Sequence, residues 1–111
     1  MKYLAPMLIL GVLFISCQRN QPKLETVLIN VKTVVCNKCI DNIKKAVYKV
    51  EGVKDVEVDL EKKIATIKFV PLQTDLQTLE VAITDAGYDA NDRPRDPDAY
   101  AGLDECCKID K

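Results

Sequence analysis

The sequence predicts a small α+β domain of the split β-α-β type, in which two helices connect the strands of one antiparallel sheet. Apolar and polar residues alternate over three stretches, as in half-buried strands, and apolar residues recur at helical spacing over two others. The order is strand, helix, strand, strand, helix, and one more strand would complete the arrangement. With 111 residues the chain can hold one such domain and its extensions.

The N-terminal residues have the pattern of an export signal. Lys2 precedes a short apolar core that ends at Ile15, too short to span a bilayer comfortably. Residues 13–17 resemble a bacterial lipobox, in which the cysteine is lipidated, although Phe14 replaces the usual leucine. We therefore expect a lipoprotein signal peptide over residues 1–16, a lipid on Cys17 and a polar tether over residues 17–23. A soluble secreted protein is the alternative.

The first strand and first helix follow directly. Residues 26–34 alternate, and the positions on one face are Val27, Ile29 and Val31. From Asn37 the period becomes helical, with an apolar stripe formed by Ile40, Ile43, Val47 and Val50. Gly52 suits the left-handed conformation that commonly follows a helix.

A hairpin and a second helix come next. Residues 56–60 and 65–69 alternate and are joined by a charged turn over residues 61–63. Thr74 and Gln77 have the spacing of a capping box, and the helix behind them carries Leu76, Leu79 and Ile83 up to Gly87. Residues 89–92 are a poor candidate for a last strand, because they are few and polar and Pro94 follows them.

A Cys-x-x-Cys motif, Cys36 and Cys39, lies where the first strand gives way to the first helix. The second cysteine falls in the first helical turn, where free N–H groups and the positive end of the helix dipole favour thiolate over thiol. Two neighbouring thiolates suit Cu(I) and other thiophilic ions. Since the chain contains no histidine, sulfur alone supports a metal site.

Three other roles remain open for this pair: a structural disulfide, a redox couple of the thioredoxin kind, and two cysteines packed as small apolar residues. A thioredoxin motif is expected near a parallel β-α-β unit in a longer domain. Chance packing is the weakest alternative, because the two-residue spacing coincides with a strand-to-helix junction. We therefore place metal binding ahead of disulfide chemistry.

Residues 24–91 resemble the heavy-metal-associated domain of copper chaperones, copper-ATPase modules and the periplasmic mercury-binding protein. The resemblance rests on Cys36-x-x-Cys39, on Gly52-Val53 followed by Val56-x-Val58-Asp59, and on Ala86-Gly87-Tyr88. It implies a ferredoxin-like βαββαβ sandwich, an antiparallel four-stranded sheet with two helices on one face, here with a weak last strand. It also implies that the loop bearing Cys36 and Cys39 holds one metal ion near the surface, for transfer by thiol exchange.

Two further positions gain a role from this resemblance. Val34 stands where the family has a methionine that anchors the loop in the core, and Val35 replaces a neighbouring threonine. Tyr88 matches the bacterial copper chaperones, where this position lies near the metal; packing at the end of the second helix is the alternative role.

Residues 92–111 form an acidic tail that ends in a vicinal pair, Cys106 and Cys107. We expect most of this tail to be flexible, with Asp96-Pro97 able to start a short helix. Adjacent cysteines rarely bridge each other, because their Cα atoms lie about 3.8 Å apart and disulfides prefer about 5.5–6 Å. A flexible segment of this length reaches roughly 20–25 Å, enough to return to the metal loop. Cys106 and Cys107 are therefore candidates for additional metal ligands or for thiol exchange, against the alternative of two incidental thiols.

Together these features predict an exported heavy-metal-binding protein that buffers or passes on a thiophilic ion. Cu(I) is the first expectation, with Hg(II) and Zn(II) as alternatives. We expect it in the cell envelope, anchored by its lipid in the outer membrane and facing the periplasm, with a metal transporter or another metal-binding domain as partner. A periplasmic thiol-disulfide protein using the same cysteines is the rival, and an interaction module with two disulfides is a third alternative.

Composition narrows the classes of function. Sixteen basic residues against 17 acidic ones leave a net charge of −1, and the chain has two Phe and no Trp. Neither a basic footprint nor an aromatic stacking platform is evident, so we do not expect nucleic acid as a partner. We do not expect an enzyme either, because no nucleophile–base pair, paired acid or phosphate-binding loop appears in the sequence.

Overall fold

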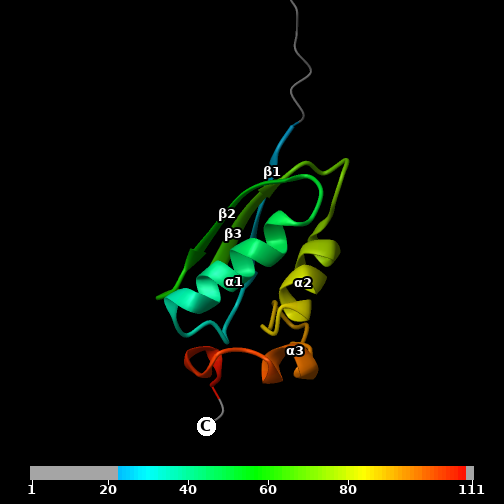
Figure 1. Cartoon of the computed structure of the whole chain (residues 1–111). Coiled ribbons are helices and arrows are strands. Elements are labelled where there is room, and N and C mark those ends of the chain that lie inside the picture. The colour runs from blue at the N-terminus through cyan, green and yellow to red at the C-terminus, as the bar shows by residue number, and fades with distance from the viewer. Residues whose placement is uncertain (1–22, 110–111) are drawn as a thin grey trace, which may run out of the picture.

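The computed structural model describes residues 23–109. Its elements are β1 (Glu25–Asn30), α1 (Asn37–Tyr48), β2 (Val53–Asp59), β3 (Ile64–Phe69), α2 (Leu76–Asp85), α3 (Pro97–Ala101) and the 3₁₀ turn η1 (Glu105–Cys107) (Figure 1). The predicted signal peptide and Cys17 lie outside the described residues, and their assignment stays a prediction.

Three antiparallel strands form the sheet, in the order β1-β3-β2. In β1, Glu25 pairs with Phe69 and Asn30 with Ile64, and in β2, Val53 pairs with Phe69 and Asp59 with Ile64. The β2–β3 hairpin turns where predicted, because the Asp59 carboxylate accepts hydrogen bonds from the N–H groups of Glu61 and Lys62, both at 2.9 Å.

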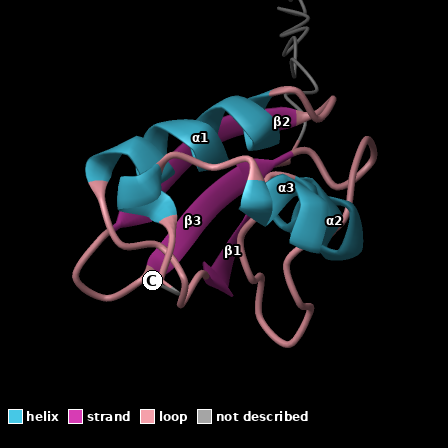
Figure 2. Ribbon diagram, turned by 60° about the horizontal axis from the view of Figure 1, so that its bottom comes forward, coloured by secondary structure: helices cyan, strands magenta, loops and turns pink. Residues whose placement is uncertain are grey.

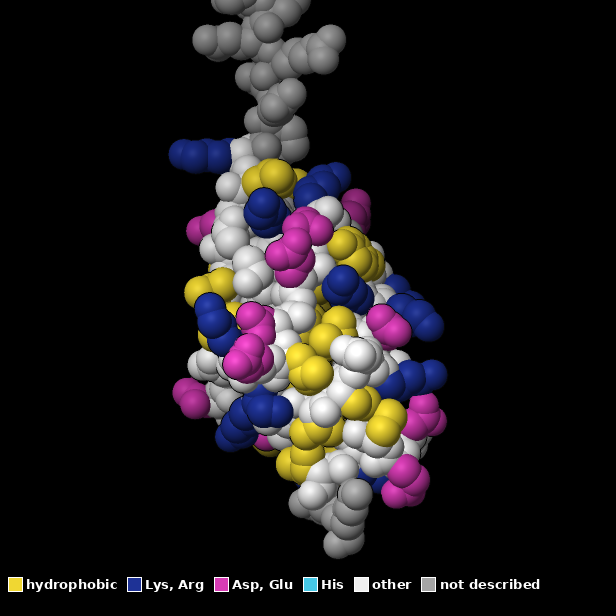
Figure 3. Space-filling view, turned by 90° about the vertical axis from the view of Figure 1, so that its left-hand side faces the viewer, with side chains coloured by type: hydrophobic (Ala, Val, Ile, Leu, Met, Phe, Trp, Pro, Cys, Tyr) yellow, Lys and Arg dark blue, Asp and Glu magenta, His cyan; other side chains and the backbone are white. Residues whose placement is uncertain are grey.

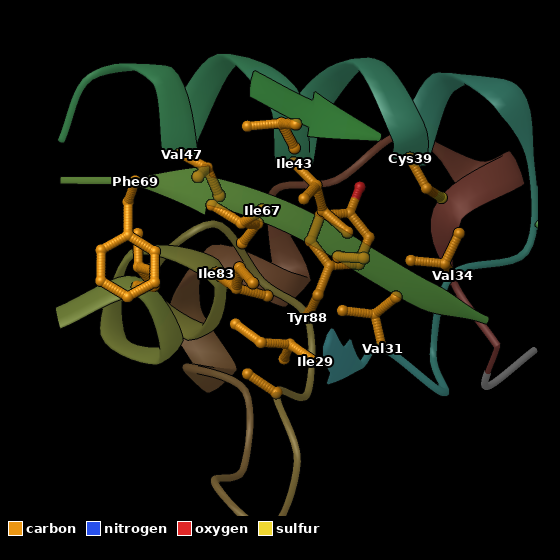
Figure 4. Packing of buried hydrophobic residues seen from close by; sticks show 14 of the residues in the cluster. Ile29, Val31, Val34, Cys39, Ile43, Val47, Ile67, Phe69, Ile83 and Tyr88 are labelled. Atoms are coloured by element: carbon orange, nitrogen blue, oxygen red, sulfur yellow. The ribbon is translucent and has the colours of Figure 1, made fainter. Parts of the chain in front are cut away.

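Both long helices lie on the same face of the sheet (Figure 2). The core fills the space between them and the strands, and its labelled members point toward one another in Figure 4. The predicted inward faces are confirmed: Ile29 and Val31 on the first stretch and Ile43 and Val47 on α1 are fully buried. Each such aliphatic side chain contributes roughly 1.5–3 kcal/mol when its burial is complete.

The fourth strand of the sandwich is absent from the described part of the chain, in keeping with the weakness of residues 89–92 as a strand. Asn91 takes a left-handed conformation (φ 52°) and turns the backbone back on itself, so that only an isolated bridge joins Ala90 to Arg93. The Asn91 N–H donates to the Asn30 carbonyl at 2.8 Å, and its side-chain oxygen accepts from the Asn30 N–H at 2.9 Å. Asn91 thereby forms hydrogen bonds with the edge of β1 at which a fourth strand would pair.

Two local predictions were wrong. The first strand stops at Asn30, and residues 31–36 form a turn in which the Val34 N–H donates to the Val31 carbonyl. Helix α2 is capped by Asp75, whose carboxylate accepts from the Thr78 N–H at 2.8 Å; the Thr74 hydroxyl, predicted as the cap, is buried with no hydrogen-bond partner. The helix therefore begins one residue later than predicted, and Asp75 accepts from the Thr78 N–H where the capping box would place the Gln77 N–H on Thr74.

The acidic tail is far more ordered than expected. Asp96 caps α3 through the Ala99 N–H, as its position before Pro97 predicts, and η1 follows. In Figure 1 this segment, orange to red, crosses the end of the molecule where α1 begins. The prediction of a mostly flexible tail is therefore wrong, because side-chain contacts hold it against the domain.

The surface carries both signs of charge. On the face drawn in Figure 3, Lys and Arg side chains alternate with Asp and Glu around a discontinuous strip of apolar ones. Among residues 23–109, no helix combines the length and the apolar character needed to cross a membrane.

Candidate metal centre

The site begins with the loop that follows β1. Val31 and Val34 are fully buried and fix the loop to the core, so Val34 occupies the anchoring position expected of it. The Lys63 ammonium group donates to the Val34 carbonyl, and the Thr33 hydroxyl accepts from the Asp89 N–H at 3.1 Å. Val35, between anchor and first cysteine, is 38% exposed. Two apolar anchors and two polar contacts therefore set the backbone position of Cys36.

Cys36 and Cys39 flank the start of α1. Cys36 is the N-cap residue, with extended backbone, and its carbonyl accepts from the Cys39 N–H at 3.1 Å. Cys39 falls in the first turn, as predicted, and its side chain is fully buried. The two Sγ atoms are 3.3 Å apart. That separation exceeds the bond of about 2.05 Å in a disulfide, so both are thiols here.

The tail brings its two cysteines to the same place. Cys36 Sγ is 3.1 Å from Cys106 Sγ and 3.5 Å from Cys107 Sγ. Cys106 and Cys107 are 3.9 Å apart at sulfur. Within the described residues, Cys36, Cys106 and Cys107 form a triangle of sulfurs that are all within 4.8 Å of one another, and Cys39 lies beside it. Residues about 70 positions apart in sequence thus gather around one point.

The four sulfurs differ in their contact with solvent. Cys106 is exposed and Cys36 is half-buried, whereas Cys39 and Cys107 are fully buried. Burial raises the pKa of the Cys107 thiol well above its usual range, and the neighbouring Cys39 thiol adds to this effect. An ion that binds Cys107 displaces the proton of this thiol.

Tyr88 lies beneath the buried sulfurs. Its ring is fully buried in the core, and Figure 4 shows its hydroxyl directed toward α1, on the side of Cys39. The hydroxyl accepts a hydrogen bond from the Asn42 amide at 2.9 Å, and burial raises the pKa of Tyr88 well above its usual range. The two roles weighed for Tyr88 are therefore compatible, since the ring packs in the core while the hydroxyl faces the cysteines.

Sequence reasoning missed Asn42 and assigned no role to Thr33. Asn42 donates to Tyr88 and lies 4.0 Å from Cys107 Sγ, one helical turn beyond Cys39 on α1. Asn42 follows Cys39 by three residues, and this spacing indicates that the two side chains are neighbours on the helix surface. Thr33 carried no comparable signal, because its contact with Asp89 depends on where the chain runs after α2.

A metal-binding module is the class of protein that this fold and cysteine loop define. A model of the heavy-metal-associated domain matches residues 28–89, and the chain belongs to that family. The match starts within β1 and ends one residue beyond Tyr88, so it includes the cysteine loop and excludes the tail. The resemblance inferred from the three separated motifs is confirmed.

The chain is similar in sequence to mercuric transport proteins and to copper-transporting ATPases. The chain is 41% identical over 64 residues to the mercuric transport protein periplasmic component of Serratia marcescens, covering 58% of this chain and 70% of that protein. It is 39% identical over 71 residues to copper-transporting ATPase 1 of Mus musculus, covering 64% of this chain but only 5% of the ATPase. The chain thus corresponds to one small part of the ATPase.

Solved structures agree with the fold. The crystal structure of oxidized MerP from Ralstonia metallidurans CH34 aligns with a TM-score of 0.60 and 38% identity, over 62% of this chain and 96% of that one. The CopZ metallochaperone aligns with a TM-score of 0.58 at 24% identity and shows the fold alone. The predicted ferredoxin-like class is therefore confirmed.

Proposed function

We propose that this chain binds one thiophilic metal ion through Cys36 and Cys39 and buffers it or passes it on by thiol exchange. The main support for this proposal is the arrangement of Cys36 and Cys39. One thiol is half-buried and the other buried, and they lie 3.3 Å apart at the first turn of α1. The N-terminal turn of a helix favours the negative charge that both sulfurs acquire as ligands. Membership of a metal-binding family supports the same conclusion.

Cu(I) is the first proposed ion and Hg(II) the second. Soft thiolate donors without nitrogen or oxygen ligands suit either ion. The similarity to copper-transporting ATPase 1 supports Cu(I). A specific observation favours Hg(II): the mercuric transport protein is of comparable length, and this chain covers 70% of it. Zn(II) needs more ligands than the pair offers.

The proposed location is the cell envelope. Residues 1–16 serve as signal peptide, and Cys17 carries lipid that holds residues 24–91 at the outer membrane, facing the periplasm. Support comes from the sequence pattern alone. A membrane transporter or a second metal-binding domain is the proposed exchange partner, and residues 92–111 form the C-terminal extension of the domain.

A thiol-disulfide function is the second candidate, and one observation favours it. The MerP structure from Ralstonia metallidurans is that of the oxidized protein. Here Cys36 lies within 3.3 Å of two other sulfurs, close enough for small side-chain rotations to form a bond. Closure would release two protons and two electrons to an oxidant, which an oxidising compartment supplies.

Metal content separates the two functions. The whole chain is prepared under reductant with Cys17→Ser, which removes the cysteine outside the described residues from every titration. We expect one tightly held Cu(I), and Cys36→Ser or Cys39→Ser should weaken its binding on the order of 100-fold or more. Unchanged affinity in the double variant would refute the proposal. A protein that binds no metal but readily cycles one disulfide would establish the second candidate instead.

A further inference from the structure

Contacts outside the sulfur cluster hold the tail cysteines next to the metal loop. The Asp96 N–H donates to the Thr84 carbonyl at 2.9 Å, which ties the start of α3 to α2. Leu103 packs against the core, and Lys38 pairs with Asp104 across 3.5 Å, which ties the tail to α1 beside Cys39. None of these contacts involves sulfur. The return of Cys106 and Cys107 to the loop therefore rests on an interface of its own.

Turn η1 then sets the direction of both side chains. The Cys107 N–H donates to the Asp104 carbonyl at 2.8 Å, which closes a tight turn around the vicinal pair. Within that turn Cys107 points into the core, where it is fully buried, and Cys106 stays at the surface. Both still approach Cys36 within 3.5 Å at sulfur. The two adjacent residues thus present their thiols to one common point from two sides.

We propose that Cys106 and Cys107 are metal ligands, which with Cys36 and Cys39 form a four-thiolate site for one divalent thiophilic ion of the Zn(II) class. The inference rests on the proposed function, because Cys36 and Cys39 supply two of the ligands. It adds two ligands to that pair, and it assigns the complete set of four a divalent ion, whereas Cys36 and Cys39 alone suit Cu(I). Binding replaces four S–H bonds by four metal–sulfur bonds, releases four protons to solvent and leaves the ion's oxidation state unchanged.

The sulfur separations fit this coordination. A metal–sulfur distance of about 2.3 Å places neighbouring sulfurs about 3.8 Å apart in a tetrahedral site and about 4.6 Å apart in a linear pair. Four of the six separations are 3.1, 3.3, 3.5 and 3.9 Å, and Cys39 Sγ lies outside the triangle of sulfurs that are all within 4.8 Å of one another. A tetrahedral ion therefore requires Cys36 and Cys106 to move apart and Cys39 to approach at least one tail sulfur by about 1 Å, and the exposed Cys106 side chain can supply part of this shift. A linear ion between Cys36 and Cys39 requires a much larger separation of that pair.

Charge favours a divalent ion over a single Cu(I). Four thiolates with one Cu(I) carry a net charge of −3, and with a divalent ion −2. Two lysines lie near the site, Lys63 on the Val34 carbonyl and Lys38 on Asp104. Asp104 offsets the charge of Lys38, so of these two lysines only Lys63 adds positive charge, and the ion must offset most of the charge of the thiolates.

The test uses Zn(II) and Co(II) as probes on the whole reduced chain with Cys17→Ser. Co(II) reports tetrahedral thiolate coordination through its visible spectrum, and X-ray absorption counts sulfur neighbours of Zn(II). We expect close to four sulfurs and a tetrahedral thiolate spectrum. Cys106→Ser with Cys107→Ser should leave about two sulfurs and weaken Zn(II) binding by about 100-fold or more for each ligand lost. Lys108→Ala is the matched control, since it changes the next residue and removes an ion pair with the exposed Glu105 but no sulfur.

Folding and the underlying function are monitored separately. Cys107 is fully buried, so Cys107→Ala tests the same ligand without placing a hydroxyl in the core, and Cys106→Ser alone tests the exposed one. Two sulfurs on Zn(II) in the parent chain, or unchanged affinity and Co(II) spectrum in all tail variants, would overturn this inference while leaving Cys36 and Cys39 as the binding pair. Loss of binding only in the tail variants, with none in Cys36→Ser and Cys39→Ser, would instead overturn the proposed function.

Discussion

Replacing Gly87 should detach the tail from the domain. Gly87 ends α2 at φ 103°, in the region that residues with a side chain avoid. A Cβ there would lie 3.1 Å from the backbone of Ala99 and Tyr100 in α3. Gly87→Ala therefore combines a left-handed backbone penalty of roughly 1–2 kcal/mol with pressure on the tail helix. For a domain of this size, that penalty lowers the melting temperature by about 4 to 16 °C.

Two measurements separate tail release from general destabilisation. Thermal unfolding of the reduced, metal-free chain gives the loss of stability. The rate at which a thiol reagent modifies Cys107, measured in a Cys106→Ser variant, reports whether the tail has detached from the domain. Cys107 is fully buried in the native state, so we expect Gly87→Ala to speed its modification at temperatures where the domain remains folded.

Gly52→Ala is the matched control. Gly52 has φ 98°, and a Cβ there would meet the side chain of Gln73, away from the tail. We expect a comparable or larger loss of melting temperature without faster native-state modification of Cys107. Equal acceleration in both variants would show that Cys107 becomes reactive through global unfolding, and no acceleration in Gly87→Ala would show that the tail does not depend on this close approach.

Three further outcomes are expected. Cys17→Ser should yield a chain that no longer partitions with membranes on fractionation, and a fully soluble native protein would contradict the lipid anchor. Tyr88→Phe should lower the free energy of unfolding in urea by about 1 kcal/mol, because the hydroxyl accepts a hydrogen bond from the Asn42 amide; an unchanged midpoint would contradict this contribution. Removing metal with a chelator under reductant should leave the circular dichroism spectrum intact, because the buried core does not depend on an ion; collapse of the spectrum would point to a structural metal.

The domain itself could be predicted from local patterns. Ile43 and Val47 on α1 and the alternation in β2 and β3 report which face each element buries, and that information lies within a few neighbouring residues. Cys36 and Cys39 were predictable for the same reason, since a strand-to-helix junction fixes their positions. The turn at Asn91 was predictable only as the absence of a good strand.

The course of the tail could not be predicted in this way. It depends on contacts between residues that carry no periodic signal, such as Arg95, which lies 3.7 Å from the centre of the Tyr100 ring. Tyr100 in turn accepts a hydrogen bond from the Ile109 N–H at 2.7 Å. Composition described an acidic, proline-containing segment, and such segments are often flexible. A few specific contacts and the space left by Gly87 outweigh that tendency here.

In the proposed four-thiolate site, exposure sets the order in which sulfurs exchange. Cys36 and Cys106 meet solvent while Cys39 and Cys107 do not, so an incoming thiolate reaches the ion from the Cys36 and Cys106 side. Each exchange forms one metal–sulfur bond as one protein thiolate leaves, so the ion never loses all its ligands. The contacts that hold the tail would keep Cys107 near such an ion during the exchange. In the proposed site, a vicinal pair on such a segment would slow the loss of the ion to water and leave two positions open to a partner's thiols.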